Sequence, residues 1–473
     1  STGEGNEMKR GGIKILHFGK RKRFQERSLP VRAFITSLLA LFLCDTLAYP
    51  GIIMTVAGDG TWDYDDFVGD GGLATEAQVG KPVGIALDSS GHLYIADNYN
   101  NRIRKVDSET GIITTVVGDG ARGFSNDGVL AAEAQLSSLR EVAFDPSGNL
   151  YFGEGYRVRR VDGATGIITT VAGNGEGGYS GDGGFATAAK LGYPSSIAFD
   201  SSSRLHIADG ANHRIRRVND NGIIVTVAGN GEAGFSGDGG LATKAQLDDP
   251  AGVAFDSSGN LYISDTGNHR IRRVDNETGI ITTIAGNGEK DYSGDGGLAT
   301  DAAFFWPAKI TITPFGHLYI ADVGNLRIRR IDGVTGIVTT VAGNGERGYS
   351  GDSLLATEAS FSSPRAVTLD SFGRLYIADM YNHRIRMVEL DPALSIFTHQ
   401  HQFFAEMRYD SESASLLLRS TKRGQLIVTD LLGNLLLTKT IEAGESRFDL
   451  SHLPRGRYFA QCGGAVEVIT KGR

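Results

Sequence analysis

Four charged residues, Arg140, Glu141, Lys309 and Arg365, stand where a recurring segment of the chain otherwise carries small or apolar residues. At this point of the segment, three other copies read Val83-Gly84, Ser195-Ser196 and Ala251-Gly252. Guanidinium and ammonium groups bind carboxylates and other anions. This mixed, net basic cluster therefore predicts a site for an anionic or sugar-like ligand, or for an acidic loop of a partner. The alternative, which the sequence leaves open, is that these are solvated channel residues.

Two further residues break the repeat and are candidate ligand contacts. Glu154 replaces an aspartate found in the other copies, beside a turn that is two residues shorter. Trp306 ends an aromatic run that begins at Phe304. We expect this run to form an aromatic patch on the same face as the charged cluster.

The short strands that carry the cluster offer few other reactive groups. They contain mainly Ile, Ala, Val, Phe and Thr, with Glu141 and no histidine. No Ser-His-Asp, thiol–imidazole or phosphate-loop arrangement is apparent in the sequence. This favours a chain that binds rather than catalyses, and no cofactor is expected.

Charged residues that recur in every copy are expected to be structural. Each aspartate is predicted to cap its turn or to pair with the arginine of its own unit rather than to form a functional ring of charge. The aspartates are Asp97, Asp209, Asp265, Asp322 and Asp379, and the arginines are Arg102, Arg214, Arg270, Arg327 and Arg384.

Three histidines, His213, His269 and His383, share one register and raise the question of a metal site. Their strands are expected to lie roughly 10 Å outside the innermost strands, because that is two strand spacings. Zinc bonds to histidine are about 2 Å long, so these side chains cannot share an ion. We therefore predict that they have a role in turns.

The recurring SGDGG loops contain Asp70, Asp127, Asp182, Asp238, Asp295 and Asp352, which are predicted to make turns. The spacing of a calcium-binding loop is absent. The best calcium candidates are Asp63, Asp65 and Asp66, in the insertion 61–67 that occurs in one copy only.

The elements that must position these residues follow from the repeat itself. A phrase similar to GIITTVAG starts at Gly51, Gly111, Gly166, Gly222, Gly279 and Gly336. Each unit reads as four short strands joined by Asp/Ser/Gly turns, which is typical of a β-propeller blade. In the third strand, Arg214, Ile215 and Arg216 alternate, which predicts one apolar and one polar face. Six units result only if residues 51–58 supply the fourth strand of the blade at 366–390, so we predict a six-bladed ring closed by its N-terminal strand.

The segments 100–106, 212–218, 268–274 and 382–388 resemble NHL repeats, and the resemblance covers roughly residues 51–390. It implies a six-bladed propeller that serves mainly as an interaction platform. The resemblance also leaves one alternative open, a metal-dependent propeller enzyme of the gluconolactonase or amidating-lyase kind that uses the central channel. Such an enzyme needs unrepeated acidic, amide or histidine side chains that converge on the axis.

Residues 1–48 are predicted to be an N-terminal extension and signal peptide. A basic stretch precedes the apolar run 33–48, which is short for a bilayer span, and cleavage is expected between Ala48 and Tyr49. An N-terminal membrane anchor is the alternative. We expect a secreted or outer-surface protein without a stable membrane span after cleavage.

Residues 49–390 are assigned to the propeller, 391–410 to a linker or extra edge, and 411–473 to a small β-sandwich domain. The last segment resembles the C-terminal sorting domain of the type IX secretion system of Bacteroidetes, on Gly433, residues 453–458, Lys471 and Arg473. The resemblance implies export by that machinery. A generic β-sandwich adhesion module is the alternative.

The formal net charge of −8 and the pI near 5.7 argue against a nucleic-acid partner, which needs a basic surface. The sequence therefore predicts a non-enzymatic binding scaffold for a protein or glycan partner on the loop-rich face of the propeller.

Overall fold

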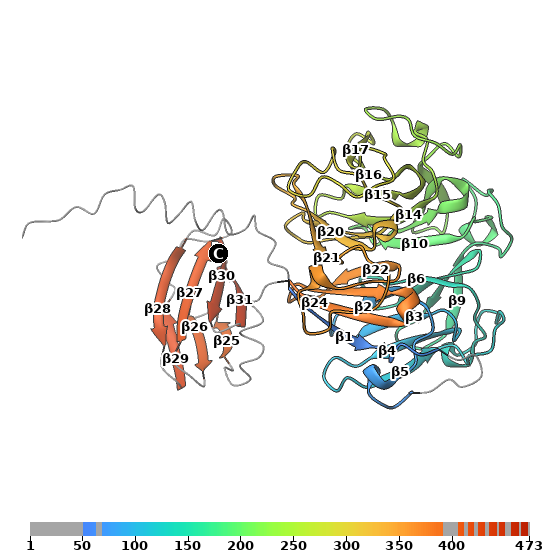
Figure 1. Ribbon diagram of the computed structural model, residues 1–473. Helices are drawn as coiled ribbons and strands as arrows, with labels where there is room; N and C mark the ends of the chain where they lie inside the picture. Colours follow the sequence, from blue (N-terminus) through green and yellow to red (C-terminus); the bar gives the residue numbers. More distant parts are fainter. Residues whose placement is uncertain are drawn as a thin grey trace, which may run out of the picture. The chain divides into compact units, whose positions relative to one another are not determined.

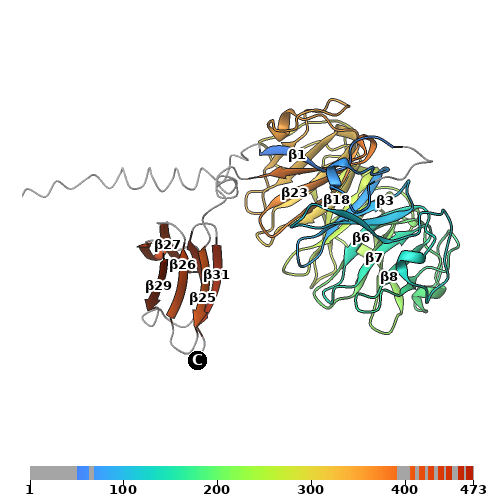
Figure 2. The same ribbon diagram turned by 90° about the horizontal axis from the view of Figure 1, so that it is seen from below.

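The computed structural model describes residues 51–62 and 69–390, and seven further strands between residues 405 and 471. Residues 52–389 form six four-stranded antiparallel sheets, arranged as blades around a common axis (Figures 1 and 2). No α-helix occurs within the described ranges, as the predicted all-β class requires. The predicted six-bladed β-propeller is confirmed.

The first strand of each blade lies nearest the axis and contacts the first strands of its two neighbours. These innermost strands are β2 (Pro82–Leu87), β6 (Leu139–Phe144), β10 (Pro194–Phe199), β14 (Pro250–Phe255), β18 (Pro307–Ile312) and β22 (Pro364–Leu369). The second strands are β3 (Leu93–Asp97), β7 (Leu150–Glu154), β11 (Leu205–Asp209), β15 (Leu261–Asp265), β19 (Leu318–Asp322) and β23 (Arg374–Asp379).

The third and fourth strands complete each blade outward. The third strands are β4 (Arg102–Val106), β8 (Arg157–Val161), β12 (Arg214–Val218), β16 (Arg270–Val274), β20 (Arg327–Ile331) and β24 (Arg384–Glu389). The fourth strands are β5 (Ile113–Val117), β9 (Ile168–Ala172), β13 (Ile224–Ala228), β17 (Ile281–Ala285), β21 (Val338–Ala342) and β1 (Ile52–Ala57).

The ring closes through β1, as predicted. β1 pairs antiparallel with β24, with Ile53 opposite Val388, so the sixth sheet has the order β1-β24-β23-β22. The blue β1 lies beside the orange strands of the last blade in Figures 1 and 2. Two chain segments more than 300 residues apart therefore share one sheet, and the sheet has no unpaired edge at the joint.

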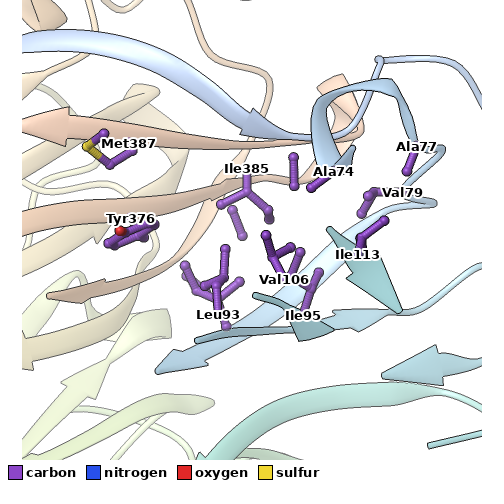
Figure 3. Close-up of a cluster of buried hydrophobic side chains, with 14 residues drawn as sticks. Ala74, Ala77, Val79, Leu93, Ile95, Val106, Ile113, Tyr376, Ile385 and Met387 are labelled. Atoms are coloured by element: carbon purple, nitrogen blue, oxygen red, sulfur yellow. The ribbon is translucent and has the colours of Figure 1, made fainter. Parts of the chain in front are cut away.

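The joint is filled by a hydrophobic cluster (Figure 3). Ile385 and Met387 of the sixth blade meet Leu93, Ile95 and Val106 of the first blade, and all five side chains are buried. Burial of apolar area contributes about 25 cal/mol per Å². The closure therefore depends on packing between blades as well as on the pairing of β1 with β24.

The loops between blades protect the outer edges of the sheets. The Gly71 N–H donates to the Ile113 carbonyl over 2.8 Å, and the Ile113 N–H donates to the Gly72 carbonyl over 3.0 Å. Unpaired strand edges promote association, and this loop segment covers the edge. Each covering segment of this kind leads into a short 3-10 helix or turn, and the helices are η1 (Ala74–Glu76), η2 (Ala131–Glu133), η3 (Ala186–Ala188), η5 (Ala242–Lys244) and η8 (Ala356–Glu358).

The second and third strands of four blades are joined through another set of 3-10 helices. These are η4 (Gly210–Asn212), η6 (Thr266–Asn268), η7 (Val323–Asn325) and η9 (Met380–Asn382). Each ends in a residue with left-handed backbone, such as His213 with φ 54°.

The sequence predicted one polar, solvent-facing side for the third strand. This prediction is wrong at one position in each blade, where an arginine is buried. Ile215 and Arg216 of β12 are both fully buried, although they point to opposite faces of the sheet. Both faces of a blade contact neighbouring blades and loops, so the third strand has no solvated side at this point. The same burial applies to Arg104, Arg159, Arg216, Arg272, Arg329 and Arg386.

Each buried arginine joins a strand to a loop. Arg216 Nη1 lies 3.2 Å from Asp209 Oδ2 of β11, and Arg216 Nη2 lies 2.6 Å from Asp182 Oδ1 of the SGDGG loop. Asp209 also accepts hydrogen bonds from the Gly192 N–H and from Asn212 Nδ2. The recurring aspartates are therefore structural, as predicted, and the SGDGG aspartates bind arginine in addition to shaping their loops.

Each third strand carries two candidate arginines, and the prediction chose the wrong one to pair with the aspartate. In β12 the aspartate pairs with Arg216 and not with Arg214. Arg214, the first arginine of β12, donates from Nη2 to the Asn230 carbonyl over 2.7 Å and lies 3.8 Å from the centroid of the Tyr179 ring. Gly231 has φ +91°, and a Cβ there would overlap the guanidinium of Arg214. The repeated AGNG and GYSG phrases thus hold the outer arginine from two sides.

Beyond the propeller, the seven further strands form two sheets, of order β25-β26-β29 and β28-β27-β30-β31. Their bounds are β25 (Ala405–Asp410), β26 (Ser415–Ser420), β27 (Gly424–Asp430), β28 (Leu435–Ile441), β29 (Gly444–Asp449), β30 (Gly456–Cys462) and β31 (Ala465–Lys471). β25 begins within the stretch predicted as linker or extra edge and pairs with β26. The β-sandwich interpretation stays a prediction.

Several sequence predictions fall outside the described residues. They concern the signal peptide with Ala48 and Tyr49, and Gly433, residues 453–455 and Arg473 of the sorting motif. Within the described part of the chain, no helix has the length and apolar character that crossing a membrane requires.

The closure of the ring can be tested with two neighbouring isoleucines. Ile53 is fully buried, whereas Ile52 is 37% exposed. We expect Ile53→Ala to lower the free energy of unfolding by about 2–5 kcal/mol and Ile52→Ala by less than about 1 kcal/mol. Urea unfolding followed by fluorescence measures both, since the two tryptophans of the chain, Trp62 and Trp306, lie in the propeller. Equal effects of the two substitutions would contradict closure through β1.

The buried arginines provide a second test. Arg216→Met leaves Asp209 and Asp182 without their cation, and we expect a loss of about 3–5 kcal/mol in the free energy of unfolding. The control is Lys190→Met, which removes an exposed ion pair with Glu176 (Nζ to Oε2 2.8 Å) near the same loop. Exposed pairs contribute little, so the unfolding midpoint of the control should not change measurably. A similar small effect for Arg216→Met would show that the buried contacts are not needed.

Candidate functional site

The innermost strands all begin on one face of the propeller, and we call the residues just before and at these strand starts the mouth. The residue immediately before each strand has left-handed backbone, with φ between 45° and 69°, at Lys81, Ser138, Tyr193, Asp249, Trp306 and Ser363. Side chains other than glycine adopt this conformation rarely, and it costs of order 1–3 kcal/mol per residue. The backbone of the mouth is therefore the same in six blades, while its side chains differ.

The three histidines help to hold this backbone in place. Nδ1 of His383 accepts a hydrogen bond from the Lys81 N–H over 3.1 Å, and Nδ1 of His269 accepts one from the Trp306 N–H over 3.3 Å. His213 does the same for Asp249 over 3.2 Å. Each bond joins one blade to the next, so the predicted turn role is extended to a contact between blades. Burial lowers the pKa of His269 and of His383, which favours the neutral form that accepts these bonds.

Two of the predicted cluster residues form an ion pair. Lys309 Nζ lies 3.0 Å from Glu141 Oε2, and Nζ is also 3.5 Å from Ser196 Oγ. Glu141 is on β6 and Lys309 on β18, three blades apart in a ring of six, so the pair reaches across the axis. We call it the axial ion pair. Burial raises the pKa of Glu141 above its ordinary value, and Lys309, the Val142 N–H and Arg365 oppose that rise.

The other two cluster residues have no carboxylate of their own. Within the described part of the chain, Arg140 and Arg365 make neither a hydrogen bond nor an ion pair through their guanidinium groups. Burial lowers the pKa of Arg365, and the nearby positive charge of Arg140 lowers it further. Asp249 and Glu141 act in the opposite direction. The mouth thus contains two cations without an ion-pair partner among the described residues, and the charge of one acts on the other.

Aromatic rings surround these cations. The Arg140 guanidinium lies 5.1 Å from the centroid of the Tyr193 ring, and the Tyr193 and Tyr156 hydroxyls are 2.9 Å apart. On the other side of the mouth, Lys81 Nζ lies 4.9 Å from the Tyr99 ring and 5.4 Å from the Tyr381 ring. Tyrosine, tryptophan and arginine are the residues that most often dominate binding surfaces. The mouth therefore combines positive charge with flat, partly exposed rings.

The predicted aromatic patch is smaller than expected. Trp306 is 51% exposed, but Phe304 is fully buried in the core of the fifth blade and does not reach the surface. Phe305, half-buried, lies against Trp306 with ring centroids 4.5 Å apart. Phe304 precedes the left-handed residue by two positions, where the other copies carry core residues such as Leu191 and Phe361.

Glu154 is placed away from the mouth cluster. Its carboxylate is buried, lies 2.8 Å from Arg159 Nη1 through Oε2, and accepts the Ser137 N–H over 3.1 Å through Oε1. It therefore fills the role of the recurring aspartate. The two-residue turn after β7 lacks the asparagine that supports the aspartate elsewhere, and the longer glutamate side chain reaches the arginine without it.

The calcium candidates Asp63, Asp65 and Asp66 lie outside the described residues. Among the residues that are described, no group of three or more His, Cys, Asp or Glu side chains is arranged to hold a metal ion.

Sequence reasoning missed several residues of the mouth, namely Lys81, Tyr99, Tyr193, Tyr381 and the buried Ser196. Lys81 and Tyr193 could have been found from the internal alignment of the repeats. Both stand in the column directly before the proline that starts most innermost strands. That column reads Lys, Ser, Tyr, Asp, Trp and Ser, and only Trp306 was selected from it.

The axial ion pair can be tested by pH. In Lys309→Met, Glu141 keeps its burial but loses its cation, so we expect the free energy of unfolding to fall by about 3 kcal/mol at pH 7. A carboxyl whose pKa is raised in the folded state binds a proton more readily there than when unfolded, so the loss should shrink as the pH falls from 7 toward the ordinary value of 4.5. Arg140 and Arg365 remain close enough to limit the effect.

The double variant Glu141→Gln/Lys309→Met should recover most of the lost stability at pH 7, because no buried charge is left. Urea unfolding at pH 7 and pH 5 gives both comparisons. A Lys309→Met loss that is the same at both pH values, or a double variant no more stable than the single one, would contradict the assignment.

Two family models match the propeller. The model described as Teneurin NHL domain matches residues 53–125 and 175–235, and the model described as NHL repeat matches residues 247–274. Human NHL repeat-containing protein 2 is 29% identical over 304 residues, which is 57% of this chain and 41% of that protein. Teneurin-m of Drosophila melanogaster is 30% identical over 376 residues, 72% of this chain but 13% of that protein. The chain thus spans less than half the length of either relative.

A solved structure shares the fold. An auxiliary nutrient binding protein from Bacteroides thetaiotaomicron superimposes with a TM-score of 0.53 at 19% identity, over 71% of this chain and 76% of that one. At this identity the similarity concerns the fold alone. The repeated sequence, the six closed blades and the matching models agree: residues 52–389 are a six-bladed β-propeller built from NHL repeats.

Proposed function

We propose that this protein is a non-enzymatic binding scaffold whose mouth binds an acidic group of a protein or carbohydrate partner. The observation that carries the proposal is that Arg140 and Arg365, two arginines of the mouth, have no carboxylate bonded to their guanidinium groups among the described residues, and that the charge of Arg140 lowers the pKa of Arg365. Like charges held together in a partly buried place are costly, and an anion relieves that cost. A bound carboxylate or sulfate would receive bidentate hydrogen bonds from such groups.

The aromatic rings support the same role. Tyr193 and Tyr381 are 41% and 46% exposed, on opposite sides of the mouth. Rings of this kind stack on sugar faces or pack against apolar side chains of a protein partner. The fold neighbour from Bacteroides is itself described as a binding protein, but the proposal rests on the residues of this chain.

We further propose that the partner is met outside the cell. The predicted signal peptide and the resemblance of residues 411–473 to a type IX sorting domain support export to the medium or the outer surface. The metal-dependent enzyme of the gluconolactonase or amidating-lyase kind is not proposed, because no observation favours it. Of the side chains that it needs on the axis, the described innermost strands supply Glu141, which is held by Lys309.

The proposal can be tested on the full chain with defined acidic probes. We expect polygalacturonate or polyglutamate to bind, and Arg140→Ala/Arg365→Ala to weaken the affinity by about tenfold or more, since each 1.4 kcal/mol of lost contact is tenfold. Arg122→Ala is the matched control, because Arg122 is an exposed arginine in the loop that leads into the second blade. Calorimetry or thermophoresis at two salt concentrations measures the affinities, with dextran as the uncharged probe.

Either of two results would overturn the proposal. One is an affinity for both acidic probes that is unchanged in the double variant. The other is an equal loss in the Arg122→Ala control, which would indicate only a general effect of net charge.

A further inference from the structure

A cavity lies on the propeller axis beyond the axial ion pair. Its volume is about 460 Å³, and all six innermost strands line it through their second halves. The lining residues there are mostly apolar, such as the partly exposed Leu87, Phe144, Phe199 and Phe255, and polar atoms make up the rest of the exposed wall. Small-molecule sites in proteins typically have volumes of about 300–1,000 Å³ and mostly apolar walls with a few polar groups.

The axial ion pair lies at one end of this cavity. Lys309 lines the cavity and belongs to the first half of its innermost strand, β18. Lys309 forms an ion pair with Glu141, which lies on the opposite side of the ring. Ser196 lies 3.5 Å from Lys309 Nζ and accepts the Val253 N–H over 3.3 Å, so four innermost strands are tied together at this level.

The other end of the cavity reaches the turns between first and second strands. Asp145, Pro146 and Asp200 line it there. The same turn position holds a carboxylate in five blades and a threonine in the other, as Asp88, Asp145, Asp200, Asp256, Thr313 and Asp370. We call these residues the rim.

The rim carries negative charge that is compensated only in part. Asp200 and Asp370 are paired with Arg204 and Arg374. The remaining three bind neutral groups of their own turns: Asp145, for example, accepts the Ser147 N–H over 2.9 Å and Asn149 Nδ2 over 2.7 Å. A cavity that is lined mainly by apolar residues and has carboxylates at one end attracts cations and repels anions.

We propose that the axial cavity binds a small organic cation with an apolar body. The body occupies the space between the innermost strands, and the positive charge stays at the rim near Asp145. Lys309 does not oppose this ligand, because Glu141 compensates its charge. The site is distinct from the mouth and does not depend on the proposed function there, since the axial ion pair stands between them.

The test uses two aromatic dyes of opposite charge with the full chain. Auramine O is cationic and fluoresces when it is immobilised, whereas anilinonaphthalene sulfonate is anionic. We expect saturable binding of auramine O at one site per chain and no saturable binding of the anionic dye over the same concentration range. Absence of saturable auramine O binding, or equal binding of both dyes, would overturn the proposal.

Variants locate the site. Thr311 and Thr368 line the cavity from β18 and β22. Thr311→Phe should fill part of it and weaken auramine O binding by about tenfold or more, and Thr368→Phe serves if the first variant does not fold. Ala251→Phe, on the mouth side of β14, is the matched control and should leave the affinity unchanged, as should Arg140→Ala/Arg365→Ala.

The charge of the rim is tested by Asp145→Asn, which keeps an acceptor for the turn. We expect a loss in affinity of severalfold that diminishes at high salt, and no loss for Asp107→Asn, an aspartate that caps a turn of β4 in the same way. Unchanged affinity in both phenylalanine variants, or in Asp145→Asn at low salt, would place the dye elsewhere and overturn the proposal.

Discussion

The structure depends on a buried guanidinium group held between two carboxylates, once in every blade. Arginine keeps its proton under all ordinary conditions, so burying an arginine is costly unless an acid lies beside it. One acid comes from the second strand of the same sheet and the other from the SGDGG loop, as Asp209 and Asp182 do for Arg216. This single arrangement explains three repeated elements of the sequence at once. It fixes the loop to the blade, and through the loop it fixes the backbone of the mouth.

A fixed backbone allows the side chains of the mouth to differ from blade to blade. The residue before each innermost strand has the same left-handed conformation whether it is Lys81, Tyr193 or Trp306. The strain of this conformation is supported from outside, by histidine side chains of the preceding blade in three places. Stability is therefore supplied by what repeats. Side chains vary at positions where the repeat constrains the main chain alone.

The sequence was sufficient to predict the blades, their number and the closing strand. These follow from the length of the repeat and from the number of its copies. It was not sufficient for the partners of the arginines. Period-two alternation assigned Arg216 to a polar face, but a blade is covered on both sides, so alternation does not separate buried from exposed residues there. The contact between Arg216 and Asp182 spans 34 residues, and no spacing rule predicts it. Likewise, Glu141 and Lys309 meet only because the ring is closed, and residues three blades apart then face each other across the axis.

The axial ion pair also explains why the mouth retains positive charge. The buried arginines of the repeated scaffold are paired with carboxylates. Glu141 is a carboxylate near Arg365, and its negative charge raises the pKa of Arg365. Lys309 extends from the opposite side of the ring, and its Nζ lies 3.0 Å from Glu141 Oε2, so this carboxylate is paired with Lys309. Arg140 and Arg365 are left without that carboxylate, Asp249 is the other acid that acts on Arg365, and burial lowers the pKa of Arg365. Two unrepeated residues on opposite blades thus pair with each other across the axis, and the guanidinium groups of Arg140 and Arg365 are left without this carboxylate.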